Sequence, residues 1–95
     1  MLTTKQKAYL RSLAQTERPV FQIGKDSLSD NLVTTVANYL KKNELVKVSV
    51  LKNNGDDLDE IAFDLARLTK SEVVQVIGRQ IVLYRRAEEP RILLP

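Results

Sequence analysis

Apolar residues recur every three or four positions in three stretches of the chain, which is the spacing of one face of an α-helix. Residues that favour helix N-termini precede each stretch: Thr3 with Gln6 at capping-box spacing, Ser29, and Asp57 with Glu60. The first helix should end before Pro19, because the residue preceding a proline is disfavoured in helical conformation. The pattern therefore predicts three helices, over residues 3–18, 29–42 and 57–68.

Four shorter apolar stretches predict β-strands, at residues 20–23, 45–51, 73–77 and 81–84. Strands joined through a helix should run parallel, whereas the Gly78–Arg79 turn should make the last two strands an antiparallel hairpin. The predicted fold class is α/β, a two-layer αβαβαββ sandwich with a four-stranded mixed sheet. Residues 1–95 should form a single domain, with residues 87–95 irregular or in a short edge strand.

Polar residues fall in the middle of the predicted strands: Gln22, Lys47, Ser49 and Gln75. In residues 45–51, valines at 46, 48 and 50 alternate with the polar positions, so only one face of this strand is apolar. One face of the sheet should therefore be incompletely covered by helices. The first helix is a candidate to cover part of it.

Charge is unevenly distributed along the chain. Residues 1–53 carry a net charge of +5, residues 54–78 carry −4 and residues 79–95 carry +2. A basic surface separated from an acidic segment suggests a polyanionic partner, although a solvated surface without a partner explains the same pattern. The N-terminus lacks the apolar core of a signal peptide and no stretch is long and apolar enough to span a membrane, so a cytoplasmic location is expected.

The chain has no histidine and no cysteine. It therefore lacks the commonest general base, the thiol nucleophile and the usual zinc ligands. One acidic group is a conceivable metal site: Asp56, Asp57, Asp59, Glu60 and Asp64. Its spacing differs from that of an EF-hand, and carboxylates also favour the first turn of a helix without any metal. The expectation is a protein that is not an enzyme and has no metal, cofactor or small-molecule substrate.

The strand-to-helix turn Gly24-Lys25-Asp26-Ser27 is the strongest candidate site. Backbone N–H groups and the helix dipole favour a phosphate at such a turn, and Lys25 adds positive charge. Asp26 opposes that charge. Tyr84, beside Arg85 and Arg86, is either a stacking platform for a base or a core tyrosine next to two solvated arginines.

The chain resembles bacterial YhbY-type proteins, which are stand-alone CRM (chloroplast RNA splicing and ribosome maturation) domains. The resemblance rests on residues 2–7, 19–25 and 44–48 and most specifically on Val74-Gln75-Val76-Ile77-Gly78 with Val82-Leu83-Tyr84-Arg85. It implies a fold similar to the C-terminal domain of bacterial translation initiation factor three and association with precursors of the large ribosomal subunit. The family's GxxG loop falls on Gly24 to Ser27, where Ser27 replaces the second glycine.

The leading hypothesis is an RNA-binding protein that assists assembly of the large ribosomal subunit, with ribosomal RNA or pre-ribosomal particles as its partner. Its RNA-binding residues are predicted in the loop and following helix, on the first helix and around the last strand: Gly24, Lys25, Asp26, Ser27, Ser29, Asn31, Lys5, Lys7, Arg11, Arg79, Tyr84, Arg85 and Arg86. One alternative is a protein-interaction module that docks through the polar sheet face or the acidic third helix. Another is a metal-dependent enzyme that uses the acidic group.

Overall fold

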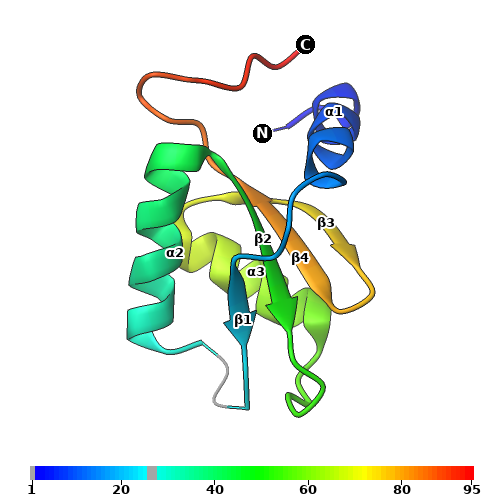
Figure 1. The fold of residues 1–95 in the computed structure, drawn as a ribbon, viewed down its shortest axis with the longest axis vertical. Coiled ribbons are helices and arrows are strands. Elements are labelled where there is room, and N and C mark those ends of the chain that lie inside the picture. The colour runs from blue at the N-terminus through cyan, green and yellow to red at the C-terminus, as the bar shows by residue number, and fades with distance from the viewer. Residues whose placement is uncertain (1, 26–27) are drawn as a thin grey trace.

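The computed structural model describes residues 2–25 and 28–95, and it contains the predicted elements in the predicted order (Figure 1). The elements are α1 (Thr4–Ala14), β1 (Phe21–Ile23), α2 (Asp30–Asn43), β2 (Leu45–Val50), α3 (Leu58–Thr69), β3 (Glu72–Ile77) and β4 (Gln80–Tyr84). The α/β sandwich with a four-stranded mixed sheet is thus confirmed. The main difference in bounds is in α1, which ends at Ala14 rather than just before Pro19.

The strands lie in the order β1-β2-β4-β3. β1 runs parallel to β2, and β4 is antiparallel to both of its neighbours, β2 and β3. The last strand therefore lies between β2 and β3. These two strands are joined through α3, so they need not be neighbours in the sheet. Gly78 adopts a positive φ of 58° in the turn between β3 and β4, a conformation that glycine adopts without steric cost.

Short-range hydrogen bonds define the start of each helix, as the sequence predicts. Thr3 and Gln6 form a reciprocal capping box on α1. The Ser29 side chain accepts a hydrogen bond from the backbone N–H of Leu32 at the start of α2. The Asp57 carboxylate accepts from the N–H groups of Asp59 and Glu60 at the start of α3. Each cap satisfies N–H groups that have no partner within the helix.

Helices α2 and α3 cover one face of the sheet and enclose the main core; in Figure 1, α3 lies behind the strands and α2 to their left. Val46, Val48 and Val50 of β2 point into it and are almost fully buried. Burial of such side chains contributes about 1.5–3 kcal/mol each. This main core holds the layered architecture together.

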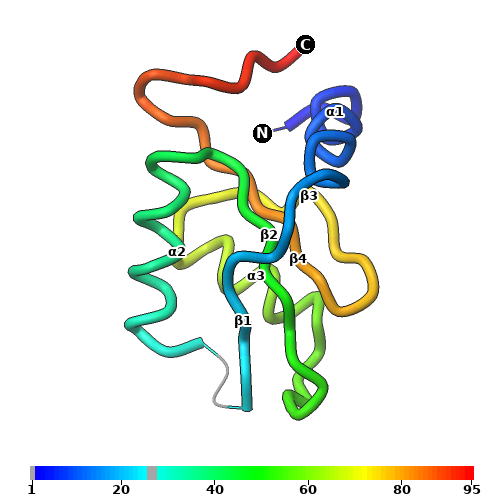
Figure 2. The backbone as a smooth tube through the Cα atoms, in the orientation of Figure 1, coloured from blue at the N-terminus to red at the C-terminus, as the bar shows by residue number. Residues whose placement is uncertain are grey.

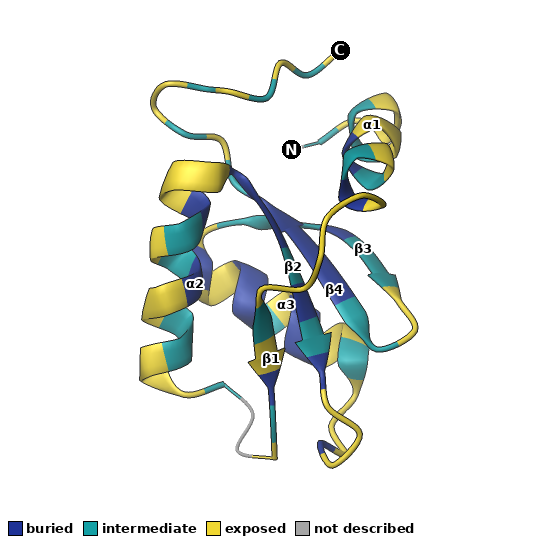
Figure 3. Ribbon diagram, in the orientation of Figure 1, coloured by how far each residue is buried: buried dark blue, intermediate teal, exposed yellow. Residues whose placement is uncertain are grey.

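Within the part of the chain that the structure describes, the opposite face of the sheet is covered only at one end, by α1 and the C-terminal residues (Figure 3). A second, smaller core forms there from Leu10, Ala14, Leu45, Val74, Val82 and Tyr84. A register shift between Val73 and Gln75 marks a bulge in β3, and the extra residue, Val74, packs into this second core. The expectation that α1 covers part of this face is confirmed.

Elsewhere on that face the sheet remains open. Gln22 pairs with Ser49, which pairs with Gln80, so these three polar residues form a row across β1, β2 and β4, and the exposed Ile77 of β3 continues it. Lys47 and Gln75, one row further toward α1, are half-buried, whereas Gln22 is exposed. The incompletely covered polar face predicted from the strand pattern is therefore present.

Residues 85–95 form neither helix nor strand, yet they lie over the same end of the molecule as α1 (Figure 2). Ile92 and Leu94 pack against the second core, and the Gln6 side-chain amide donates to the carbonyl of Pro95 over 3.2 Å. The N-terminal helix and the C-terminal residues therefore meet although they are far apart in sequence. Over the described residues, no helix combines the length and apolarity that crossing a membrane requires.

Candidate nucleic-acid interface

The loop between β1 and α2 leaves the main core at one apolar residue and returns to it at another. Ile23 is fully buried before the loop, and Leu28 packs against the main core after it. Lys25, between these two anchors, is exposed. Asp26 and Ser27 lie outside the described residues. The structure therefore presents the Lys25 side chain to solvent from a segment held at both ends.

The start of this loop is braced by a hydrogen-bond network centred on Asn54. The buried Asn54 side chain donates to the carbonyl of Gly24 over 2.9 Å and accepts from the N–H of Asp56 over 2.8 Å. Arg79 donates through Nε to Val50 O and through Nη2 to Leu51 O and Asn54 O, at 2.8–3.0 Å. These bonds hold the loop between β2 and α3 against Gly24, the first residue after β1.

Arg79 was predicted as an RNA contact, and the structure gives it a structural role as well. Three of its five guanidinium N–H groups point to backbone carbonyls. Its positive charge is not neutralised by these carbonyls, so phosphate contact through the remaining N–H groups stays a prediction. Asn54 has a positioning role that sequence reasoning missed, because Asn53-Asn54-Gly55 is typical of an ordinary turn.

Gly24 is not required by the backbone conformation. Its φ lies outside the left-handed region, and an added Cβ would meet only the Leu51 side chain, at an ordinary contact distance of 3.9 Å. The absence of a side chain instead leaves the backbone at Gly24 open to close approach by a ligand. This observation fits a role in binding better than a role in folding.

The N-terminus of α2 faces the same loop. Ser29 and Asn31 are both exposed there. Ser29 satisfies the N–H of Leu32, so by helix geometry the N–H groups of Asp30 and Asn31 have no partner within α2. These groups and the helix dipole suit an anion, while the Asp30 carboxylate in the same turn opposes one.

The predicted basic residues on α1 and after β4 lie at the other end of the sheet. α1 packs against the start of β2 and the end of β4, whereas β1 and the loop adjoin the end of β2. The six residues of β2 span about 17 Å at 3.3 Å per residue. Lys5 is exposed, and Lys7 and Arg11 are half-buried. The predicted residues thus form two groups rather than one site.

Tyr84 is not a stacking platform. Only 4% of its surface is exposed, and it belongs to the second core beneath α1. Its hydroxyl hydrogen-bonds the carboxylate of Glu44, and burial together with the negative charge of Glu44 raises its pKa. The core interpretation is therefore the correct one, because a ring packed in this way cannot stack on a base. Its neighbours differ: Arg86 is exposed, and Arg85 is half-buried with Nη1 donating to Thr69 O over 3.3 Å.

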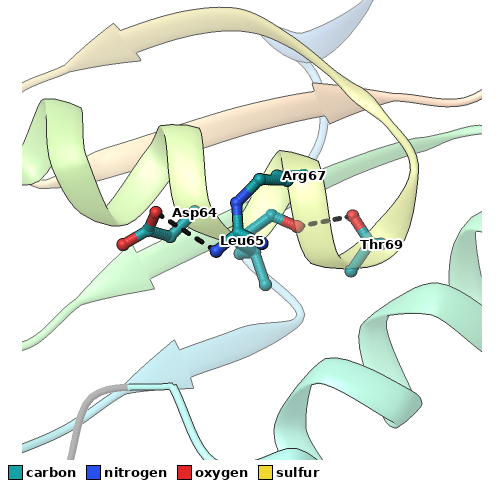
Figure 4. A network of polar contacts seen from close by, with 4 residues as sticks. All are labelled: Asp64, Leu65, Arg67 and Thr69. Carbon is teal, nitrogen blue, oxygen red and sulfur yellow. Dashed lines mark hydrogen bonds and ion pairs between the residues drawn. The ribbon is translucent and has the colours of Figure 1, made fainter.

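Two of the acidic residues around α3 have partners in the structure. Asp57 caps the helix, and Asp64 forms an ion pair with Arg67 at 3.6 Å, one turn along (Figure 4). Figure 4 also shows the buried Thr69 hydroxyl, which donates to Leu65 O over 2.7 Å. Among the described residues, no group of three or more carboxylates is arranged to hold a metal ion.

The chain is similar in sequence and in fold to known proteins. The model of the CRS1 / YhbY (CRM) domain matches residues 2–85. The chain is 45% identical to the probable RNA-binding protein YqeI of Bacillus subtilis over 94% of this chain and 93% of YqeI, and 38% identical to an RNA-binding protein of Haemophilus influenzae over 99% and 95%. The solution structure of the hypothetical protein SAV1595 from Staphylococcus aureus is similar over the full length of both chains, with 51% identity and a TM-score of 0.85. The chain therefore belongs to the CRS1 / YhbY (CRM) domain family.

Proposed function

We propose that this domain binds RNA through the loop at Gly24 and Lys25 and the adjoining N-terminus of α2. The observation that carries the proposal is the exposed Lys25 on a loop anchored by Ile23 and Leu28 and braced by Asn54. The hydrogen bond from Asn54 holds the backbone at Gly24 in place, which lowers the entropy cost of holding a phosphate there. The relatives named as RNA-binding proteins support the same conclusion.

Within this proposal the basic residues of α1 and those after β4 extend the contact to the far end of the sheet. Lys5, Lys7, Arg11 and Arg86 supply charge there, and the row of polar residues on the open sheet face lies between the two ends. Asp26 and Ser27, which lie outside the described residues, remain part of the predicted loop. Binding should weaken steeply with salt, since each phosphate contact releases counterions.

The loop is tested by Lys25→Gln, with Arg67→Gln as the matched control. Both substitutions remove one positive charge from an exposed side chain, but Arg67 lies on α3 and pairs with Asp64. Removal of one phosphate contact should lower RNA affinity about fivefold near 0.1 M salt and reduce the salt slope by about 0.7. Equal affinities for the two variants would exclude the loop as a phosphate contact.

We further propose that the RNA is ribosomal and that the protein assists assembly of the large ribosomal subunit in the cytoplasm. Ultraviolet crosslinking of the tagged protein in cells, followed by sequencing of the attached RNA, tests this step. Enrichment at a defined region of large-subunit ribosomal RNA is expected. Crosslinks confined to other RNAs would preserve RNA binding but remove the ribosomal role.

A protein-interaction module remains the second candidate because of one specific observation. Phe63 on the outer side of α3 is 66% exposed, and Asp59 and Glu60 lie one turn before it on the same side of the helix. An exposed aromatic side chain among carboxylates suits a basic protein surface. Charge reversal at Asp59 and Glu60 that abolished capture of a protein partner, with RNA affinity unchanged, would favour this function.

A further inference from the structure

A basic hollow lies between the last turn of α2 and the chain that follows β4. Its volume is about 490 Å³, and eight residues line it: Lys41, Lys42, Arg85, Arg86, Ala87, Glu88, Glu89 and Arg91. Five of these carry a positive charge and two a negative charge. Lys41, Lys42 and Arg91 were not among the predicted RNA contacts, because the two lysines are adequately explained as favourable charges at a helix C-terminus.

The two walls of the hollow are joined by Glu44, which follows α2 and is fully buried. One carboxylate oxygen accepts hydrogen bonds from the N–H groups of Arg91 and Ile92, at 2.5 and 3.0 Å, and the other accepts from Ala87 at 3.3 Å. The Glu44 carbonyl also accepts from the N–H of Arg85 at 2.8 Å. Glu44 therefore fixes the backbone of residues 85–92 against the end of α2.

The Glu44 carboxylate accepts hydrogen bonds from backbone N–H groups and the Tyr84 hydroxyl rather than from the surrounding cations. Within residues 2–25 and 28–95, no hydrogen bond or ion pair occupies the side-chain nitrogens of Lys41, Lys42 or Arg91, and all three residues are exposed. Like charges held around one hollow repel one another, and an anion placed between them offsets that repulsion. The side-chain nitrogens are thus available to such an anion.

We propose that this hollow is a second phosphate site of the RNA interface, contacted by Lys41, Lys42 and Arg91, with Glu44 as its positioning residue. This inference rests on the proposed RNA-binding function and extends it beyond residue 85, where the match to the family ends. An RNA backbone is favoured over an isolated anion because Arg85 and Arg86 connect the hollow to the basic end of the sheet near α1. One polyanion would then contact all of these cations.

The test measures binding of a labelled single-stranded RNA of mixed sequence, about 20 nucleotides long and so longer than common single-strand sites. The double variant Lys42→Gln with Arg91→Gln should bind about 25-fold more weakly near 0.1 M salt and lower the salt slope by about 1.4, as expected for two lost phosphate contacts. Arg67→Gln is the single-charge control, and Arg67→Gln with Lys70→Gln matches the double variant in charge.

The outcomes separate this inference from the proposed function. If the unaltered protein does not bind RNA, the proposed function fails and this inference with it. If Lys25→Gln weakens binding but the Lys42/Arg91 variant matches its control, only the hollow is excluded. Binding of inorganic phosphate in the hollow, with RNA affinity unchanged in the double variant, would also overturn the proposal.

The positioning role of Glu44 has its own readout. Glu44→Gln retains the side-chain length but replaces one acceptor oxygen with a donor, so it should release Arg91 and lower RNA affinity by about the same fivefold as Arg91→Gln. Combining the two substitutions should then cost little more than either alone. Fully additive losses would refute the positioning role. If Glu44→Gln does not fold, the Lys42/Arg91 variant still decides whether the hollow binds RNA.

Discussion

Replacement of Glu44 by glutamine should destabilise the domain at neutral pH by about 2–4 kcal/mol. The carboxylate accepts three backbone hydrogen bonds from Ala87, Arg91 and Ile92 while fully buried. A hydrogen bond to a charged group contributes about 1.5–3 kcal/mol and one to a neutral group about 0.5–1.5 kcal/mol. Over three bonds the difference is about 3–4.5 kcal/mol. The expected loss is somewhat smaller because the C-terminal residues can detach and be hydrated.

The effect should depend on pH in a defined direction. Burial raises the pKa of the Glu44 carboxyl, but hydrogen bonds from the N–H groups of Arg91, Ile92 and Ala87 and from the Tyr84 hydroxyl together outweigh burial, and the pKa lies below its ordinary value of 4.5. A lowered pKa in the folded state gives stability that is present above pH 4.5 and is lost as the pH falls through the folded-state value. Glutamine does not titrate, so the variant lacks this loss.

Urea unfolding of both proteins at a series of pH values between 7 and 3 measures the difference. The difference in free energy of unfolding should be largest at pH 7 and should shrink below pH 4.5, because the contributions of the other carboxylates cancel between the two proteins. Glu88→Gln, at an exposed position in the same segment, is the control and should change stability by less than about 0.5 kcal/mol. A difference in free energy of unfolding that is absent at pH 7, or constant over the whole pH range, would refute this stabilising role of the buried Glu44 carboxylate.

Three further substitutions separate folding from binding. Tyr84→Phe keeps the buried ring but removes its hydrogen bond to Glu44, so urea unfolding should show a loss of about 1–2 kcal/mol, with RNA affinity unchanged within twofold. Asn54→Ala leaves Gly24 O and Asp56 N without their side-chain partner, which should cost about 2 kcal/mol and accelerate amide exchange at Asp56. Gly24→Ala should change the free energy of unfolding by less than about 0.5 kcal/mol, since the added Cβ meets only Leu51. It should nevertheless weaken RNA binding several-fold in a titration. Unchanged affinity would exclude a close approach of RNA to the backbone at Gly24.

The parts of the fold that depend on short stretches of sequence were predictable. The caps at Thr3, Ser29 and Asp57 each act over two or three residues, and the alternation in β2 reports directly which face is buried. The αβαβαββ order followed from these signals. The loop at Lys25 could be located in the same way, because a strand followed by a helix cap requires a turn between them.

The features that were missed depend on contacts between distant residues. The Lys41-Lys42-Asn43-Glu44 sequence is typical of a solvated helix end, yet Glu44 is fully buried with a positive φ of 65° and bonds residues more than 40 positions away. Asn54 has the local signature of a turn, whereas its bond to Gly24 spans 30 positions. Tyr84 beside two arginines has the composition of a stacking site, and only the packing of α1 shows that it is buried. In each case tertiary packing, not local propensity, decides the role.

The separation of the two basic ends predicts how affinity depends on RNA length. β2 places the loop and α1 ends about 17 Å apart, a distance that about five nucleotides cover in a stacked strand at 3.4 Å per nucleotide. An RNA of about four nucleotides should therefore contact one end only, while one of about ten can contact both and gain from their high effective concentration. Replacement of Lys5 by glutamine should lower the affinity for the longer RNA about fivefold. The affinity for a short RNA bound at the loop should not change. If Lys25→Gln and Lys5→Gln lowered the affinity for the short RNA equally, this prediction would be wrong. The two groups of basic residues would then have to act as a single site.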